Sequence, residues 1–218
     1  MPADNAEIVQ LKKTYEEIKS KIVWRLNEFR RLWDGGAEEE LFAEVAFCLL
    51  TPQSKAKVCW GAVEGLRAKK LLLYGNAIQI AKELRGVRFH NVKARRIVKA
   101  RALFMSNGNI AVRPLLTQFD NNQEARDWLV RNVEGFGYKE ASHFLRNIGL
   151  GSGLAILDRH ILKNLSHLGV IGTLQKSLSG HKYMEVERRM KGFAEEIKIP
   201  MEHLDLLLWY RETGEVFK

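Results

Sequence analysis

Apolar residues recur along most of the chain at steps of three and four positions, which is the spacing of an amphipathic helix. In the first such segment the apolar positions are Ile8, Leu11, Tyr15, Ile18, Ile22 and Leu26. The same pattern predicts further helices over residues 38–50, 55–68, 76–84, 92–106, 122–132, 138–148, 158–168, 183–197 and 203–212. Glycine or proline separates most of these segments, as expected of turns and helix caps. Because strand-like alternation is nearly absent, the sequence predicts an all-α fold.

The connections between the predicted helices are short, so neighbouring helices are expected to pack locally into two lobes around a cleft. Residues 1–60 and 170–218 are assigned to one lobe and residues 61–169 to the other. The 218 residues, 46% of them hydrophobic, are enough to bury a core in either lobe. No run of 18 apolar residues is present and the N-terminus does not resemble a signal peptide, so a cytoplasmic location is expected.

Charge and cysteine content narrow the class of partner. The formal net charge is +9, from 35 basic and 26 acidic residues, and such an excess commonly accompanies phosphate-rich partners. Many basic proteins do not bind DNA, so charge alone leaves the partner open. Cys48 and Cys59 are the only cysteines, and without a histidine cluster they are too few for a zinc site or an iron-sulfur cluster. Both are expected to be buried thiols, and no metal or redox cofactor is expected.

The most informative segment is residues 129–144, LVRNVEGFGYKEASHF. Two predicted helices meet there at a tight turn containing Gly135 and Gly137, both of which are expected to permit positive φ, while Ala141 allows close helix contact. This is the pattern of a helix-hairpin-helix, whose backbone amides can bind a DNA phosphate. Taken alone, the turn is better explained as an ordinary capped helix corner.

Lys139 and Asp158 add chemistry to this turn. Lys139 falls in the first turn of the second hairpin helix, where the helix dipole disfavours a cation, and a neutral amine is what nucleophilic attack requires. Asp158 follows an apolar run and opens the next helix, so an N-cap is its simplest role. A carboxylate held there could also accept a proton from the lysine and stabilise positive charge on a sugar.

These residues resemble a known family. The segment GFGYKEASHFLRN at residues 135–147, with LDRH at residues 157–160, resembles the helix-hairpin-helix DNA glycosylase superfamily and its archaeal-type 8-oxoguanine DNA glycosylase/AP lyase branch. The resemblance extends through FCLLT at residues 47–51 and LDLLLWY at residues 204–210. It implies that the cleft binds double-stranded DNA containing 8-oxoguanine, with the damaged nucleotide flipped out of the duplex. It implies no catalytic metal or redox cofactor.

The resemblance also implies roles for single residues. Lys139 would attack C1′ and form a Schiff base from which β-elimination cuts the strand, with Asp158 as its partner carboxylate. Phe89 and Trp209 would stack on the flipped base, with packing in the core as the alternative for Trp209. The terminal Lys218 would supply an acceptor for the N7 proton that distinguishes 8-oxoguanine from guanine, unless the tail is frayed.

Further residues are expected to contact DNA on the same basis. Gln53 would lie near the gap left by the flipped nucleotide, with Ser54 as a simple N-cap being the competing explanation for this turn. Arg88 and Arg95 belong to a basic segment suited to phosphates, and His160 resembles a family element near the DNA backbone, with a capped helix histidine as the alternative.

Other functions remain open at this point. A non-catalytic helix-hairpin-helix module would have no need of the lysine and aspartate, and a glycosylase of other base specificity is disfavoured by the C-terminal pattern. A basic RNA-associated helical bundle is a third alternative, distinguished by salt-dependent binding without strand cleavage. The sequence predicts a monomeric bifunctional enzyme associated with a prokaryotic, archaeal chromosome.

Overall fold

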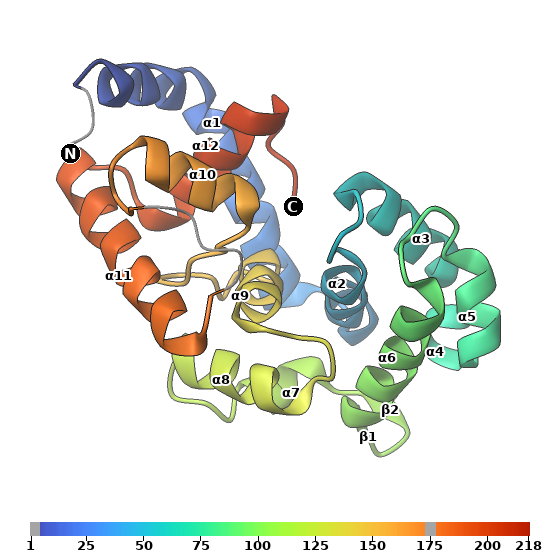
Figure 1. Ribbon diagram of the computed structural model, residues 1–218. Helices are drawn as coiled ribbons and strands as arrows, with labels where there is room; N and C mark the ends of the chain where they lie inside the picture. The colour runs from blue at the N-terminus through green and yellow to red at the C-terminus, as the bar shows by residue number, and fades with distance from the viewer. Residues whose placement is uncertain (1–4, 173–177) are drawn as a thin grey trace.

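The computed structural model describes residues 5–172 and 178–218, which are mostly helical (Figure 1). The helices are α1 (Asn5–Gly35), α2 (Glu38–Leu50), α3 (Ala56–Ala68), α4 (Leu71–Tyr74), α5 (Ala77–Glu83), α6 (His90–Leu103), α7 (Val112–Leu116), α8 (Asn122–Asn132), α9 (Tyr138–Asn147), α10 (Arg159–His167), α11 (Gly180–Ile197) and α12 (Met201–Thr213). A two-residue hairpin of β1 (Met105–Ser106) and β2 (Asn109–Ile110) is the exception. The prediction of an all-α fold is confirmed. In the described ranges no helix is long and apolar enough to cross a membrane.

Helix boundaries follow the hydrophobic periodicity closely except near residue 105. Helices α2 and α8 begin and end where the pattern predicted. The helix predicted over residues 92–106 is wrong at both ends, because α6 starts at His90 and stops at Leu103. Asn107 and Gly108 then take positive φ values of 50° and 80°, and this Asn-Gly turn forms the β-hairpin instead. Helices α4 and α7 have four and five residues, too few to show a period.

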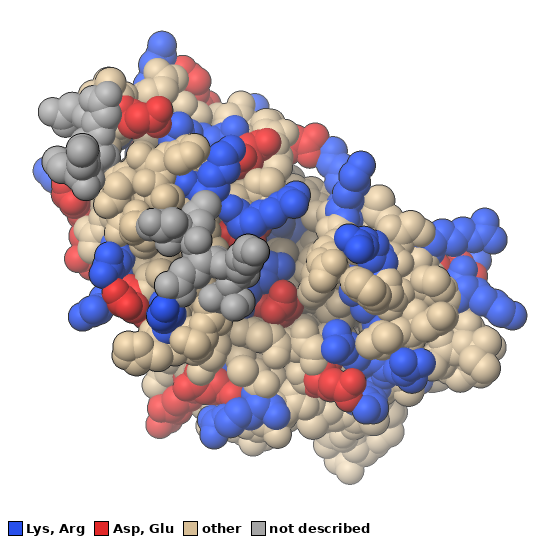
Figure 2. All heavy atoms as spheres, in the orientation of Figure 1, with Lys and Arg blue, Asp and Glu red and all other residues tan. Residues whose placement is uncertain are grey.

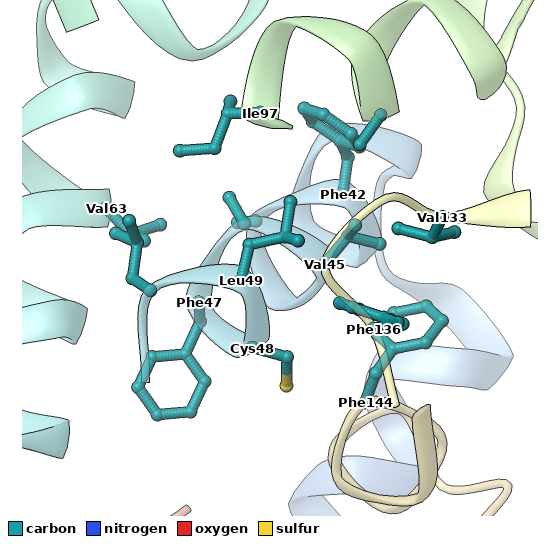
Figure 3. Packing of buried hydrophobic residues seen from close by; sticks show 14 of the residues in the cluster. Phe42, Val45, Phe47, Cys48, Leu49, Val63, Ile97, Val133, Phe136 and Phe144 are labelled. Atoms are coloured by element: carbon teal, nitrogen blue, oxygen red, sulfur yellow. The ribbon is translucent and has the colours of Figure 1, made fainter. Parts of the chain in front are cut away.

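Helix α2 lies at the centre of the larger buried cluster, with ten of its thirteen residues buried. Val63 of α3 and Ile97 of α6 pack near one side of it, and Phe136 and Phe144 of the hairpin pack near the other (Figure 3). A helix that is apolar all round must be enclosed in this way. Helix α2 therefore joins the α3–α6 bundle to the predicted helix-hairpin-helix.

A second buried cluster is built from α1, α10, α11 and α12, so the two ends of the chain pack together (Figure 1). The last buried residue of the first cluster along the chain is Leu154. The second cluster contains residues of α1 and then continues from Ala155. Buried residues thus place α2 and α3 in the first cluster and α10 in the second. The division of lobes at residues 60 and 170 stays a prediction.

A buried ion pair ties these parts together. Arg126 of α8 is 1% exposed and donates to both carboxylate oxygens of Glu187 of α11, at 2.6 and 2.9 Å. Glu187 also accepts the Ala155 N–H at 2.7 Å, and Tyr183 donates to the Ala155 carbonyl at 2.7 Å. The Arg126 guanidinium lies 5.4 Å from the centre of the Tyr138 ring. One pair of charges therefore holds both the start of α9 and the chain leading to residue 158.

Replacing Arg126 with Met should lower the free energy of unfolding by about 3 to 5 kcal/mol, because Glu187 would keep a buried charge without its partner. Arg126→Met/Glu187→Met should recover much of that loss. Arg189→Met, which removes an exposed pair with Glu185 on the same helix, should change stability by less than about 1 kcal/mol. Urea unfolding measures all three, and a loss below about 1 kcal/mol for Arg126→Met would show that the pair is not structurally important.

Candidate active site

The turn between α8 and α9 is a glycine turn whose two glycines differ. Gly135 has φ +100°, and a Cβ there would lie 2.7 Å from Cδ of Arg96, so both conformation and space favour glycine. Gly137 has φ −107° and ψ −173°, so the expectation of positive φ at this residue is wrong. It is the N-cap of α9, and its N–H donates to Glu140 at 3.1 Å. Ala141 is fully buried, as close helix contact requires.

Lys139 is the second residue of α9, and its side chain is 24% exposed. Its amine lies 3.5 Å from Glu140, the same side chain that caps the helix start through Gly137. Glu140 therefore offsets the unfavourable position of a cation at the positive end of a helix dipole. The lysine is held at the protein surface by a partner from its own helix turn.

Asp158 is the N-cap of α10, as its position in the sequence predicted. Its Oδ1 accepts the N–H groups of His160 and Ile161 at 2.8 and 2.9 Å. Both bonds use Oδ1. No residue in the described ranges donates a hydrogen bond to Oδ2, so this oxygen can serve another partner. The backbone before it is fixed by α11, because Tyr183 accepts the Leu157 N–H at 3.2 Å.

Lys139 and Asp158 both act electrostatically on Asp205, a buried residue of α12 paired with Arg146 at 3.1 Å. Burial raises the pKa of Asp205 to about 6, Arg146 and Lys139 oppose this rise, and Asp158 adds to it. A lysine from the hairpin and a carboxylate from the start of α10 thus influence the same buried acid.

Lys218 ends the chain in an enclosed position. Its ammonium pairs with Glu44 of α2 and lies 3.3 Å from the centre of the Trp60 ring, and its side chain is only 13% exposed. The prediction of a frayed tail is therefore wrong. Its backbone lies beside His143 of α9, whose pKa is lowered well below the usual value by burial, with Arg146 and Lys139 adding to the effect. The sequence analysis did not identify Glu44 as the partner of Lys218. The one indication in the sequence was an acidic residue within the otherwise apolar part of a predicted helix.

The two predicted stacking residues differ in exposure. Phe89 is 55% exposed and takes φ +57°, and the Arg88 guanidinium lies 5.4 Å from its ring centre. Trp209 is half-buried, and its ring meets His160 edge-on at 5.3 Å. The structure therefore places Phe89 outside the core. His160 also lies 3.5 Å from Glu212, which links α10 to α12.

The structure of the turn after α2 rules out one alternative explanation from the sequence, that of Ser54 as a helix N-cap. Lys55 is the N-cap of α3 and makes no side-chain capping bond, so the explanation of Ser54 as the N-cap is wrong. Ser54 instead accepts bonds from Lys93 and from the Arg88 N–H. Gln53 and Arg95 are exposed.

Figure 2 shows Lys and Arg side chains on both sides of a hollow between the two halves of the molecule, on the face that Figure 1 presents.

Cys48 and Cys59 are buried free thiols, as predicted. Residues 5–172 and 178–218 contain no group of three His, Cys, Asp or Glu side chains that could hold a metal ion.

The fold and the hairpin are those of the helix-hairpin-helix DNA glycosylase superfamily. Residues 22–199 match the family described as 8-oxoguanine DNA glycosylase, and the chain belongs to that family. The 8-oxoguanine DNA glycosylase/AP lyase of Fusobacterium nucleatum is 43% identical over 96% of each chain. That of Methanocaldococcus jannaschii is 38% identical over 97% of this chain and 98% of the other.

Solved structures agree with the sequence relatives. The crystal structure of the Thermotoga maritima 8-oxoguanine DNA glycosylase has a TM-score of 0.85 and 36% identity, covering 97% of this chain and 98% of the other. The Methanocaldococcus jannaschii glycosylase/lyase in complex with a 15mer DNA containing 8-oxoguanine has a TM-score of 0.87 and 35% identity, covering 97% and 99%. The predicted resemblance is confirmed, with relatives in bacteria as well as archaea.

Proposed function

We propose that this chain excises 8-oxoguanine from duplex DNA and then cleaves the strand as an AP lyase. The observation that carries the proposal is Lys139 at the start of α9, together with Asp158 at the start of α10, each of which acts electrostatically on the buried Asp205. Its relatives named 8-oxoguanine DNA glycosylase/AP lyase cover nearly the whole chain. A prokaryotic, cytoplasmic, chromosome-associated monomer stays the prediction from the sequence.

In this proposal the neutral amine of Lys139 attacks C1′ of the damaged nucleotide, and the bond from C1′ to the base breaks. The base departs with the bonding electrons and takes up a proton. Loss of the amine proton and opening of the sugar give a Schiff base, and removal of a C2′ proton then expels the 3′ phosphate. Asp158 is proposed to stabilise positive charge on the sugar through Oδ2, while Oδ1 keeps its cap bonds.

The hairpin is proposed to bind a DNA phosphate beside the reacting sugar. The Gly137 N–H is already used by Glu140, so Gly137 is proposed to allow close approach rather than to donate. Gly135 keeps the turn narrow through its positive φ. Arg88, Arg95 and His160 are proposed as further contacts with the DNA backbone.

Base recognition is proposed to involve Phe89 and Trp209 as stacking surfaces and the end of the chain as the sensor. Glu44 and Trp60 hold the Lys218 ammonium, and the terminal backbone group, which lies beside His143, is proposed to accept the N7 proton of 8-oxoguanine. Guanine lacks that proton, and its N7 lone pair would face the same acceptor.

The first test concerns the nucleophile. Lys139→Gln should abolish both base excision and covalent trapping by borohydride on a duplex containing one 8-oxoguanine, because an amide cannot form a Schiff base. Binding to the same duplex should persist, since the hairpin is unchanged. Lys191→Gln, on an exposed position of α11, is the matched control and should trap as the unaltered protein does. Trapping that survives in Lys139→Gln would place the nucleophile elsewhere.

The second test separates capping from catalysis at Asp158. Asn can accept the same two backbone bonds through its Oδ1, so Asp158→Asn should keep α10 and the free energy of unfolding nearly unchanged. Single-turnover excision should nevertheless fall by roughly 100-fold or more, the scale of a positioned charged group. A loss of only a few-fold would reduce Asp158 to a helix cap.

The third test concerns lesion identity. Deleting Lys218 should lower the preference for 8-oxoguanine over guanine by roughly 5-fold to 150-fold, equivalent to losing one buried hydrogen bond of about 1 to 3 kcal/mol. Single-turnover excision from matched duplexes gives the preference, and cleavage of a preformed abasic site serves as the internal control. Unchanged preference would remove Lys218 from base recognition, and an equal loss on the abasic site would indicate damage to the fold.

A further inference from the structure

Lys93 of α6 is a buried cation that the chemistry proposed above does not use. It is 2% exposed, and its ammonium donates to the carbonyls of Leu50 and Pro52, both at 2.7 Å, and to the Ser54 hydroxyl at 3.1 Å. These three acceptors match the three protons of an ammonium group. All three belong to the end of α2 and the turn that follows it. Lys93 therefore caps the negative end of α2 from another helix.

Two strained residues lie at the ends of this network. Gln53 has φ +56° and Phe89 has φ +57°, in the left-handed region that residues with a side chain rarely adopt. Phe89 is the N-cap of α6, and among the other non-glycine residues with positive φ in the described ranges Lys70 and Lys198 likewise cap helices, while Asn107 lies in the β-hairpin turn. Gln53 and Phe89 are both exposed, so core packing does not explain their backbone conformation.

Lys93 and Ser54 connect the backbone that flanks these two residues. Gln53 lies between Pro52 and Ser54, and both of these accept bonds from the Lys93 ammonium. The Lys93 backbone N–H donates to the Phe89 carbonyl at 3.0 Å. The Ser54 hydroxyl oxygen also accepts the N–H of Arg88, the residue before Phe89, at 3.1 Å. The same buried groups thus fix the backbone on both sides.

We propose that Lys93 is a positioning residue that holds Gln53 and Phe89 as one rigid pair, so that opening the damaged base pair and capturing the extruded base depend on the same buried ammonium. This inference rests on the proposed function. Lys93 touches neither DNA nor the reacting atoms and acts through the two exposed side chains. A pair fixed before binding loses little entropy when it meets DNA.

The test compares two substrates. Lys93→Met keeps an unbranched side chain, one heavy atom shorter, and removes the ammonium, so excision of 8-oxoguanine from duplex DNA should slow by roughly 10-fold to 100-fold, since misplacement by about 1 Å can cost about 100-fold. Cleavage of a preformed abasic site should change by only a few-fold, because there is no base to extrude or stack. Both rates are measured under single-turnover conditions well below the unfolding temperature of each variant.

Arg101→Met is the matched control. Arg101 lies on the same helix and also binds carbonyls of its own lobe, those of Leu72 and Gly75 at 3.1 and 2.8 Å. Its loss should destabilise that lobe without selective loss of excision. If Lys93→Met does not fold, Ser54→Ala removes the shared acceptor more gently and should show the same selectivity between substrates.

A double-mutant cycle decides whether Lys93 acts through the pair. In a Gln53→Ala/Phe89→Ala background, Lys93→Met should cause little further loss of excision, because the side chains that it positions are gone. An undiminished further loss, an equal loss on the abasic site, or full excision by Lys93→Met and Ser54→Ala would each overturn the proposal. Failure of the unaltered protein to excise 8-oxoguanine would instead refute the proposed function.

Discussion

The buried pair of Arg126 and Glu187 is the interaction on which the geometry of the site depends. Its arginine lies against Tyr138, which precedes Lys139, and its glutamate accepts the Ala155 N–H three residues before Asp158. Lys139 and Asp158 come from different helices, and this pair connects the backbone beside each of them. Because a bidentate arginine-carboxylate contact tolerates little displacement, the relative placement of hairpin and α10 is fixed at this point.

Helix α2 performs a similar role for the other side of the site. Its buried Glu44 holds the Lys218 ammonium, and its last carbonyl, that of Leu50, accepts from Lys93. Its apolar faces contact both the α3–α6 bundle and the hairpin (Figure 3). The end of the chain, the Gln53 turn and the hairpin are therefore all positioned from one helix enclosed in the core.

The sequence predicted the helices well because amphipathic periodicity is a local property. It also predicted Asp158 as an N-cap, since capping depends on a few neighbouring residues. It did not predict that Gly137 has an extended backbone, although the capping partner Glu140 is only three residues away. It could not predict that Lys218 is enclosed, because that depends on Glu44, which is far away in the sequence. Lys93 lies between Arg88 and Arg95, in the basic segment that suggested phosphate contacts, and only the fold reveals that it is buried.

The buried charges share a feature that stability alone does not explain. A buried ion pair usually adds little net stability over well-packed apolar residues, because desolvation offsets the attraction between the charges. Yet Arg126, Glu44 and Lys93 each bind next to a residue proposed to act on DNA. Apolar substitutes would fill the same volume without directional bonds, and the neighbouring backbone could then relax. We infer that these charges serve chiefly to limit the conformations of the site, so that its exposed side chains meet DNA already in place.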